Sequence, residues 1–262
     1  MATEQLAEID ALFSLAGRTA LITGASGGIG AATARVLAAA GARVILIARN
    51  LDRLEEEAAH LRASGAQALA LRADLGTEQG LEALVAALAT AGEAPDILVN
   101  NAGMIDRAAF DDVSRPGWDE VIGLNLTAPM FLTQALIPAM RARGWGRVVN
   151  IASILALQGK KNAHSYTASK HAIAGLTRSM AAELGQDGVC VNALCPGYIR
   201  TEINTVLQQD AGFGAMIAAR VPLQRWGETA DLAGPLLLLC SPAASYLNGH
   251  MLVVDGGMTA VH

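Results

Sequence analysis

The sequence predicts an α/β protein built on a mostly parallel β-sheet with helices on both faces. Short runs of β-branched and aliphatic residues alternate with longer Ala- and Leu-rich segments of helical periodicity over almost the whole chain of 262 residues. A glycine-rich segment follows the first such run and precedes the first helical segment. Strands separated by helices need crossover connections, which place neighbouring strands parallel and cover both faces of the sheet.

The individual elements can be placed in chain order. Strands are expected at Thr19–Thr23, Arg43–Ile47, Gln67–Leu71, Ile97–Asn100, Arg147–Ile151, Cys190–Leu194 and Met251–Val254. Helices are expected at Ile29–Ala40, Asp52–Ala63 and Thr77–Ala91, then after Trp118, around Ala168–Leu184 and at Thr229–Leu239. Glycine closes the last turn of many helices, and the first three are followed by Gly41, Gly65 and Gly92. The helix after Trp118 is expected to be kinked or broken at Pro129 and Pro138.

The chain is expected to form a single domain over residues 1–262. With 52% hydrophobic and 16% charged residues it can bury a large core, and no linker or low-complexity segment divides it. The longest segment without a clear strand is 196–225. We expect this segment to be an insertion that covers the substrate pocket, and a surface helical hairpin without such a role is the alternative.

Composition and charge argue against several classes of partner. A net charge of −5 disfavours binding to nucleic-acid backbones, which needs a basic face. The opening residues lack the basic and apolar regions of a secretory signal, and the apolar segment Pro235–Cys240 is far too short to span a bilayer. We therefore expect a cytoplasmic protein without a membrane partner. The three cysteines, Cys190, Cys195 and Cys240, form no metal-site pattern with the histidines, so no metal is expected.

A nucleotide-binding turn is expected where the first strand meets the first helix. The segment 23–30 reads TGASGGIG, with glycines at positions 24, 28 and 30. Glycines let the backbone approach a pyrophosphate closely, and the free amides and dipole of a helix N-terminus favour its negative charge. The spacing differs from the GxGxxG fingerprint, and a tight turn without a ligand would accept the same glycines.

Loops after the next three strands are expected to complete this site, because the carboxyl ends of parallel strands meet at one edge. Ala48 and Arg49 follow the second strand, where an acidic residue would bind a ribose 2′-hydroxyl and a basic one a 2′-phosphate. NADP(H) is therefore favoured over NAD(H), with a solvated arginine as the alternative. Asp74 follows the third strand and Asn101 the fourth. Asp74 could instead cap the next helix, and Asn101 could merely stabilise its own turn.

Tyr166 and Lys170 are the candidate proton-transfer residues. Their spacing of four places both on one face of a helix. We expect the ammonium, together with the positive charge of an oxidised nicotinamide, to lower the pKa of the tyrosine from roughly 10. Such a tyrosine can protonate a carbonyl or deprotonate an alcohol, while Ser153 hydrogen-bonds the same oxygen. Asn125, a polar residue in an apolar helical stretch, is expected to support a proton path from Lys170, or else only to distort the helix near Pro129.

Taken in order, these segments resemble the short-chain dehydrogenase/reductase family. The matching segments are TGASGGIG at 23–30, NNAG at 100–103, Asn125, Ser153, YTASK at 166–170 and Pro196-Gly197. They cover almost the whole chain. The resemblance implies a single Rossmann-type, doubly wound domain with a seven-stranded parallel sheet, and commonly a homotetramer. It also implies a catalytic tetrad of Asn125, Ser153, Tyr166 and Lys170.

The same resemblance assigns residues to the nicotinamide cofactor. The pyrophosphate side would be held by Gly24, Ser26, Gly28, Ile29 and Gly30. The adenine would lie against Asp74 and Leu75, and the adjoining ribose region against Asn101, Ala102 and Gly103. The nicotinamide end would contact Tyr166, Lys170, Pro196, Gly197, Ile199 and Thr201. The pair Ala48-Arg49 resembles the NADP-preferring subgroup.

A finer resemblance points to a substrate class. Segments 224–228 and 246–250 look like the gluconate 5-dehydrogenase and 2-deoxygluconate 3-dehydrogenase branch, which implies a sugar acid or polyol as small-molecule substrate. Arg107 is then a candidate for binding the carboxylate, and Gln158 and His164 for contacting hydroxyl groups, with plain surface positions as the alternative. Two further hypotheses stay open: a 3-oxoacyl-[acyl-carrier-protein] reductase, and a dinucleotide-binding protein without catalysis.

Overall fold

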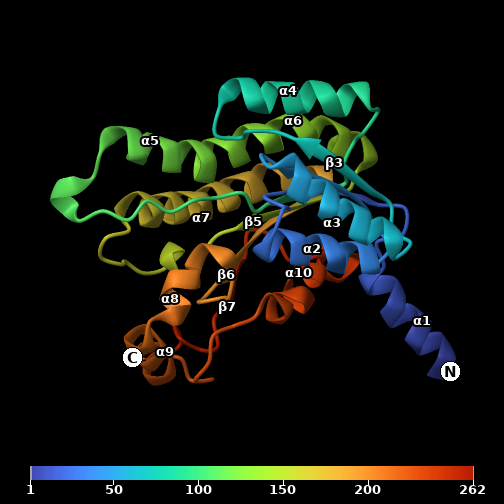
Figure 1. Ribbon diagram of the computed structural model, residues 1–262. Coiled ribbons are helices and arrows are strands. Elements are labelled where there is room, and N and C mark those ends of the chain that lie inside the picture. Colours follow the sequence, from blue (N-terminus) through green and yellow to red (C-terminus); the bar gives the residue numbers. More distant parts are fainter. Residues whose placement is uncertain (1, 262) are drawn as a thin grey trace.

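Seven strands form one sheet in the computed structural model, which describes residues 2–261 (Figure 1). The strands are β1 (Thr19–Thr23), β2 (Arg43–Ala48), β3 (Ala68–Arg72), β4 (Ile97–Asn100), β5 (Gly146–Ile151), β6 (Val189–Pro196) and β7 (Met251–Val254). Their order is β3-β2-β1-β4-β5-β6-β7, and every neighbouring pair is parallel. The predicted α/β class with a seven-stranded parallel sheet is confirmed.

Helices cover both faces of this sheet. One face carries α2 (Gly28–Ala39), α3 (Leu51–Ala63) and α10 (Ala233–Cys240). The other face carries α4 (Glu78–Thr90), α6 (Ala128–Arg143) and α7 (His164–Leu184). The sequence did not predict α1 (Ala2–Phe13), which extends away from the sheet in Figure 1. Local signals explain two of the starts, since the side chains of Asn50 and Thr77 accept hydrogen bonds from the first turns of α3 and α4.

Alternate residues of each strand face the two helical layers. In β1, Leu21 packs with α4 and α6 while Ile22 packs with α2 and α10, and all of these positions are buried. Leu98 and Val99 of β4 divide in the same way. A strand buried on both faces reads as a continuous apolar run, which is why the strand positions could be predicted closely.

The strand order reverses next to β1. The chain runs outward from β1 to β3 and then returns, so that β4 pairs with the free side of β1. The loops that leave β1 and β4 therefore diverge toward opposite faces and leave a crevice between them at the carboxyl edge of the sheet. This topology, rather than any single motif, decides where a ligand can bind.

Three predicted helices differ from the structure at their ends. The helix predicted around Ala168–Leu184 begins earlier, at His164. Its first turn carries no side-chain cap or apolar periodicity, so the sequence does not mark this start. The segment predicted as Thr229–Leu239 begins as the 3-10 turn η6 (Thr229–Leu232) before α10. Pro129 lies in the first turn of α6, directly after a π-helical turn that joins α6 to the preceding helix, and Pro138 lies inside α6 without ending it.

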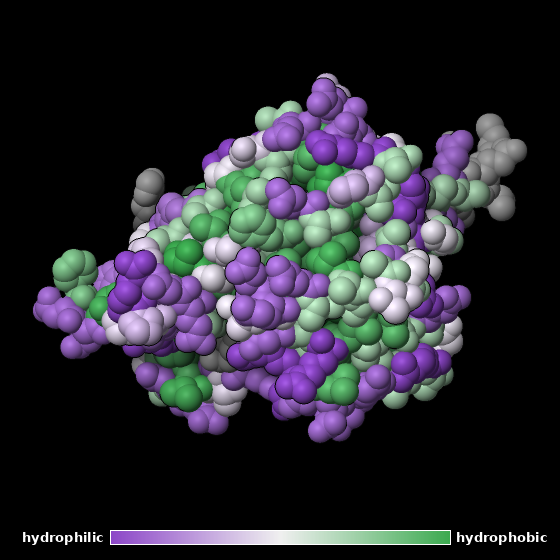
Figure 2. Space-filling view, turned by 90° about the horizontal axis from the view of Figure 1, so that it is seen from above, coloured by the Kyte–Doolittle hydropathy of each residue, from purple (hydrophilic) through white to green (hydrophobic). Residues whose placement is uncertain are grey.

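The continuous helical stretch from Arg115 to Arg143 is long and apolar enough to cross a membrane by length and composition alone. It comprises α5 (Arg115–Ile122), a π-helical turn η2 (Gly123–Thr127) and α6. Its apolar side is used within the protein, because Leu132 and Met140 are fully buried beneath α6. Figure 2 views the molecule from above, the side of α4 and α6, and shows hydrophilic residues around the hydrophobic ones there.

The segment 196–225 carries η5 (Glu202–Asn204), α8 (Thr205–Gln209) and α9 (Ala211–Arg220). Tyr198 and Phe213 of this segment form an aromatic cluster with Trp226, which follows directly, and the ring centroids lie 5.3 to 5.8 Å apart. Ile217 of α9 is buried in the same apolar cluster as Leu155. The segment therefore lies against the carboxyl edge of the sheet, beside the end of β5.

Candidate active site

The turn between β1 and α2 has a backbone that only glycine can form without strain. Gly24 and Gly28 have φ values of +66° and +54°, in the left-handed region. A Cβ on Gly30 would collide with the carbonyl oxygen of Gly24 and come within 2.6 Å of the Asn101 amide nitrogen. No side chain caps α2, whose preceding residue is Gly27. The result is a cradle of exposed backbone at a helix N-terminus, which suits a pyrophosphate.

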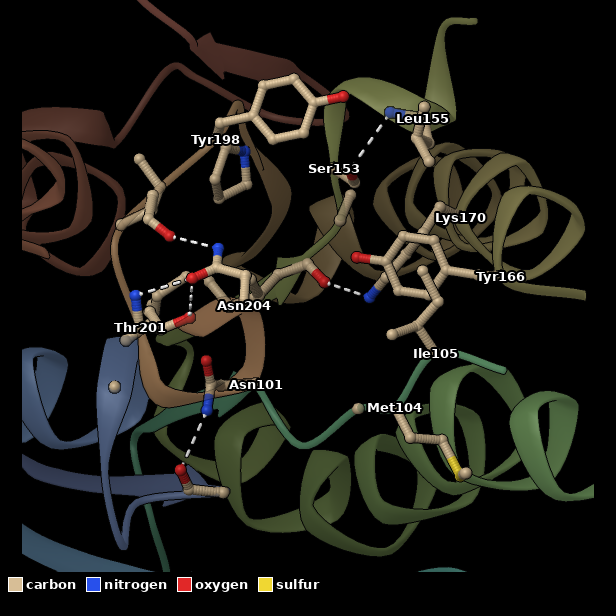
Figure 3. Close-up of a pocket in the computed structure, with 18 of the residues that line it drawn as sticks. Asn101, Met104, Ile105, Ser153, Leu155, Tyr166, Lys170, Tyr198, Thr201 and Asn204 are labelled. Atoms are coloured by element: carbon tan, nitrogen blue, oxygen red, sulfur yellow. Dashed lines mark hydrogen bonds between the residues drawn. The ribbon is translucent and has the colours of Figure 1, made fainter. Parts of the chain in front are cut away.

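Side-chain hydrogen bonds hold the loop after β4 against this cradle. Asn101 donates from Nδ2 to the Thr23 carbonyl oxygen at 2.8 Å. The same nitrogen donates to the Gly24 carbonyl oxygen at 3.2 Å (Figure 3). The Thr23 hydroxyl accepts hydrogen bonds from the backbone amides of Asn101 and Ala102, both at 2.9 Å. Two loops that are far apart in sequence are thereby fixed to each other at the point where the strand order reverses.

The close packing at Gly30 leads to a first prediction. Gly30→Ala is expected to lower the unfolding free energy by about 1–3 kcal/mol and to weaken NADPH binding at least tenfold, because the added methyl group displaces the Gly24 carbonyl. Thermal unfolding and a fluorescence titration with NADPH measure the two effects. Gly175→Ala is the control, since a Cβ there meets nothing within 4 Å. Unchanged NADPH affinity in Gly30→Ala would contradict a binding role for this turn.

The carboxyl end of β5 and the first turns of α7 bring three predicted residues together. Tyr166 and Lys170 lie on one face of α7, with Lys170 Nζ 5.4 Å from the centroid of the Tyr166 ring. Lys170 donates to the Ile151 carbonyl oxygen at 2.7 Å, which fixes the buried ammonium beneath the tyrosine. Ser153 accepts a hydrogen bond from the Leu155 amide at 3.1 Å, so its hydroxyl hydrogen stays available to a ligand. Figure 3 shows these side chains around one pocket.

Asn125 lies behind the pocket in the π-helical turn. Its side chain accepts from the Met104 amide and donates to the Met104 carbonyl, both at 2.9 Å. It also donates to the Ser169 hydroxyl at 3.1 Å. A Cβ on Gly103 would meet Asn125 Oδ1 at 3.2 Å and Lys170 Nζ at 3.8 Å, so these three residues are immediate neighbours. Asn125 thus ties the loop after β4 to α7 rather than only distorting its own helix.

One cavity of about 370 Å³ runs from the glycine cradle to Tyr166. Fifteen of the residues singled out in the sequence line it, namely Gly24, Ser26, Gly28, Ile29, Asn101, Ala102, Gly103, Arg107, Ser153, Tyr166, Lys170, Pro196, Gly197, Ile199 and Thr201. A long cavity with a phosphate cradle at one end and a half-buried tyrosine beside a buried lysine at the other has the layout expected of a dinucleotide and substrate site.

Comparison with known proteins agrees with this layout. A family model of the short-chain dehydrogenases/reductases, described as enoyl-(acyl carrier protein) reductase, matches residues 24–259. The chain belongs to this family. It is accordingly an NAD(P)-dependent oxidoreductase that acts on CH–OH groups, and the family resemblance seen in the sequence is confirmed.

Three related proteins of this family are similar over nearly their full length. The chain is 39% identical to gluconate 5-dehydrogenase of Gluconobacter oxydans (strain 621H), covering 95% of this chain and 97% of that one. A crystal structure of a gluconate 5-dehydrogenase from Burkholderia cenocepacia J2315 with NADP and tartrate superposes with a TM-score of 0.93 at 36% identity, covering 97% and 100%. A 3-oxoacyl (acyl-carrier-protein) reductase from Agrobacterium tumefaciens C58 with NADP bound gives 0.90 at 34%, covering 95% and 96%.

The predicted site residues that do not line the cavity fall into two groups. Gly30 and Asn125 lie directly behind it and shape it, as described above. The others are Arg49, Asp74, Leu75, Gln158 and His164. Arg49 is exposed at the end of β2. Asp74 accepts a hydrogen bond from the Gly76 amide at 3.1 Å, so it stabilises its own turn while Thr77 caps α4. His164 packs edge-on against Phe110 at 5.5 Å.

Several cavity residues of this short-chain dehydrogenase/reductase were not predicted. Arg53, Lys160, Tyr198 and Asn204 all line the cavity. Asn204 donates to the Ile199 carbonyl oxygen at 2.6 Å and shapes the loop after β6 (Figure 3). None of the four belongs to a recognisable motif. Their placement depends on how the segment 196–225 packs against α3 and the β5–α7 loop, and a local pattern cannot reveal this.

Burial sets the proton affinities of the Tyr166–Lys170 pair. Burial raises the pKa of Tyr166, while the neighbouring Ser153 hydroxyl and the positive charge of Arg107 act in the opposite direction. Burial also lowers the pKa of Lys170 from 10.5 to about 8. The sequence led us to expect a lowered pKa for Tyr166, caused by Lys170 together with an oxidised nicotinamide. The protein side chains alone do not produce this lowering. With these side chains alone around it, Tyr166 is a protonated phenol at neutral pH.

Proposed function

We propose that this protein interconverts the hydroxyl and ketone forms of a sugar acid or closely related polyol. The observation that carries the proposal is the position of Arg107, which lines the same cavity as Tyr166 and is near enough for its charge to lower the pKa of that phenol. A guanidinium beside the proton donor suits an anionic substrate. The similarity to gluconate 5-dehydrogenases supports the same class.

In the proposed mechanism each polar residue acts on one oxygen of the substrate. Tyr166 donates its phenolic proton to a ketone oxygen during reduction and takes the hydroxyl proton during oxidation. Ser153 hydrogen-bonds that oxygen as its charge changes. Lys170 stabilises the tyrosinate from below, and Asn125 holds the Met104 backbone and α7 in place. The nicotinamide ring, when bound, supplies or accepts the hydride.

The residues that would hold the cofactor are those of the glycine cradle and its neighbouring loops. Gly24, Gly28 and Gly30 give the pyrophosphate access to backbone amides. Thr201 adjoins them, since a Cβ on Gly28 would meet its methyl carbon at 3.5 Å. The adenine side, at Asp74 and Leu75, rests on the family resemblance. An intact Ser153, Tyr166 and Lys170 set argues against a dinucleotide-binding protein that lacks catalysis.

We also propose that NADP(H) is preferred to NAD(H). Arg49 is exposed directly after β2, and its neighbours along the chain, Ala48 and Asn50, carry no negative charge that would repel a 2′-phosphate. Arg49→Ala is expected to raise the KM for NADP(H) about tenfold and to leave the KM for NAD(H) within twofold, because only the phosphate contact is lost. Arg62→Ala, at the far end of α3, is the control. Equal changes for both cofactors would remove Arg49 from this role.

A substrate panel tests the function directly. Purified protein is assayed with NADP(H) and NAD(H) against sugar acids, polyols and 3-oxoacyl thioesters, following the absorbance of the reduced nicotinamide. Turnover of a sugar acid supports the proposal. Turnover of 3-oxoacyl thioesters alone would favour the second candidate, to which the structural similarity to a 3-oxoacyl (acyl-carrier-protein) reductase points. No turnover of any compound would overturn both.

Assembly and location complete the proposal. We propose that the protein acts as a homotetramer in the cytoplasm, on the basis of its family, and that the segment 196–225 covers the substrate within a single domain. Light scattering coupled to size-exclusion chromatography measures the assembly. A mass of one subunit, with full activity, would contradict the tetramer.

A further inference from the structure

We propose that Lys160 binds the carboxylate of the substrate and that the segment 196–225 positions it through Tyr198 and Phe213. This inference rests on the proposed function, because it assumes an anionic substrate. It adds a specificity residue on the side of the pocket formed by the β5–α7 loop. Neither a sequence motif nor the position of Arg107 points to this residue.

Lys160 lies in the loop that joins η3 (Ile154–Ala156) to α7. This loop connects the strand end that carries Ser153 to the helix that carries Tyr166, so its residues lie close to the reacting groups. Lys160 lines the cavity, whereas its neighbour Lys161 is exposed and does not. Asn162 follows in a left-handed conformation, with φ of +59°, which turns the chain back toward α7.

The ammonium of Lys160 is held by aromatic residues rather than by an acid. Its Nζ donates to the Tyr198 hydroxyl at 2.8 Å. The same atom lies 4.8 Å from the centroid of the Tyr198 ring and 5.3 Å from that of Phe213. Aromatic rings attract a cation without neutralising its charge. An ammonium has three donors, so hydrogen atoms stay available to a ligand oxygen after the bond to Tyr198.

More positively than negatively charged side chains line the cavity. Its one acidic residue, Glu202, pairs with Arg53 at 2.8 Å. Among the described residues, neither Lys160 nor Arg107 has a carboxylate within 4.0 Å. Two cations without acidic partners in one partly enclosed cavity attract an anion strongly. Tyr198 and Phe213, which contact the Lys160 ammonium, belong to the same apolar cluster as Tyr166.

The arrangement explains how the enzyme could distinguish an acid from an uncharged polyol of the same shape. A lysine acts as a compact charge on a flexible stem, and here the ammonium is held by the Tyr198 hydroxyl and lies close to two aromatic rings. A carboxylate that reaches Lys160 replaces water around an already positioned ammonium, so little side-chain freedom is lost on binding. The segment 196–225 would then contribute to substrate choice through contacts to Lys160, besides covering the pocket.

The test compares Lys160→Met with Lys161→Met, using D-gluconate or whichever sugar acid the parent oxidises best, and the neutral amide of the same acid. We expect Lys160→Met to raise the KM for the acid about 10- to 100-fold with kcat within twofold, and to change the KM for the amide less than twofold. Lys161→Met should match the parent with both compounds. Lys160→Arg, which keeps the charge, should recover most of the loss.

Tyr198→Phe tests the positioning role separately. It removes the hydrogen bond to Lys160 but keeps both rings, so the KM for the acid should rise by a smaller factor than in Lys160→Met, again without loss of kcat. In the double variant Lys160→Met/Tyr198→Phe the second change should add nothing. Effects that multiply would mean that Tyr198 acts independently of Lys160 and would overturn its positioning role.

The outcomes separate the two proposals. If the parent oxidises sugar acids but Lys160→Met keeps the parental KM, or loses acid and amide equally while its melting temperature is unchanged, the Lys160 inference is wrong and the proposed function stands. If the parent oxidises no sugar acid in the panel, the proposed function fails, and the inference fails with it. A loss in Lys160→Met that Lys160→Arg does not recover would also overturn the charge-based role.

Discussion

Tyr166→Phe is expected to lower kcat/KM for the sugar acid by about 10²- to 10⁴-fold, the range usual for removal of a positioned general acid–base group. The ring is retained, so its packing beside Ile105 and above Lys170 should be preserved. Binding of NADPH, followed by fluorescence, should therefore stay within about twofold of the parent. The change removes only the proton that Tyr166 passes to or from the substrate oxygen.

The chain provides a matched control for this variant. Tyr246 is fully exposed. Tyr246→Phe therefore removes a tyrosine hydroxyl group at the protein surface, outside the cavity. Its kcat/KM should equal that of the parent. Activity in Tyr166→Phe that matches Tyr246→Phe would remove Tyr166 from the mechanism, and with it the proposed role of α7 in proton transfer.

Lys170→Met is expected to abolish activity to a similar extent and to change how stability depends on pH. In the folded protein the pKa of Lys170 is lowered to about 8, whereas the unfolded chain keeps the ordinary value of 10.5. Between these two values the unfolded state binds more protons, so this residue makes the unfolding free energy rise with pH across that window. The lowering corresponds to ~3 kcal/mol, which is the cost of holding the buried ammonium charged below pH 8.

Urea unfolding of parent and Lys170→Met at pH 7 and at pH 10.5 measures this effect. The difference between the two proteins should shift by ~3 kcal/mol in favour of the parent as the pH rises. Cys195, whose pKa burial raises to about 11, acts in the opposite direction in both proteins, and the Lys170 charge opposes that rise only in the parent. Lys161→Met, an exposed substitution, should show no such shift. A pH-independent difference for Lys170→Met would contradict a buried, easily deprotonated lysine.

The sequence predicted those parts of the fold that local physics determines. Thr19–Thr23, Ile97–Asn100 and Met251–Val254 were placed to the residue, because each is a short apolar run with polar or glycine residues beside it. The start of α7 was placed four residues late, since Ala163 offers no capping side chain and the first turn is polar. Helix ends without a capping side chain depend on tertiary contacts, and these leave little trace in a single sequence.

The residues of the site also divide into those that the sequence could locate and those that it could not. Gly24 and Ser153 could be located in advance because each follows a predicted strand, and Tyr166 because of its spacing of four residues from Lys170. Lys160 could not, because its contacts come from Tyr198 and Phe213, which are 38 and 53 residues away along the chain. Neither aromatic residue shows a spacing pattern that links it to the loop before α7. The substrate end of the pocket is thus built mainly from long-range packing, and the cofactor end from local turns.

The π-helical turn between α5 and α6 has a consequence for how this enzyme can change. A π turn contains one more residue than an α-helical turn, and it is the less stable form of helix. Deleting one residue from 123–127 would restore a regular helix, but it would rotate Asn125 away from Met104 and Ser169. A more regular helix and an intact link between the β4 loop and α7 are therefore incompatible in this segment. Selection for a more stable fold alone would remove the π-helical turn, whereas selection for catalytic activity has to keep it.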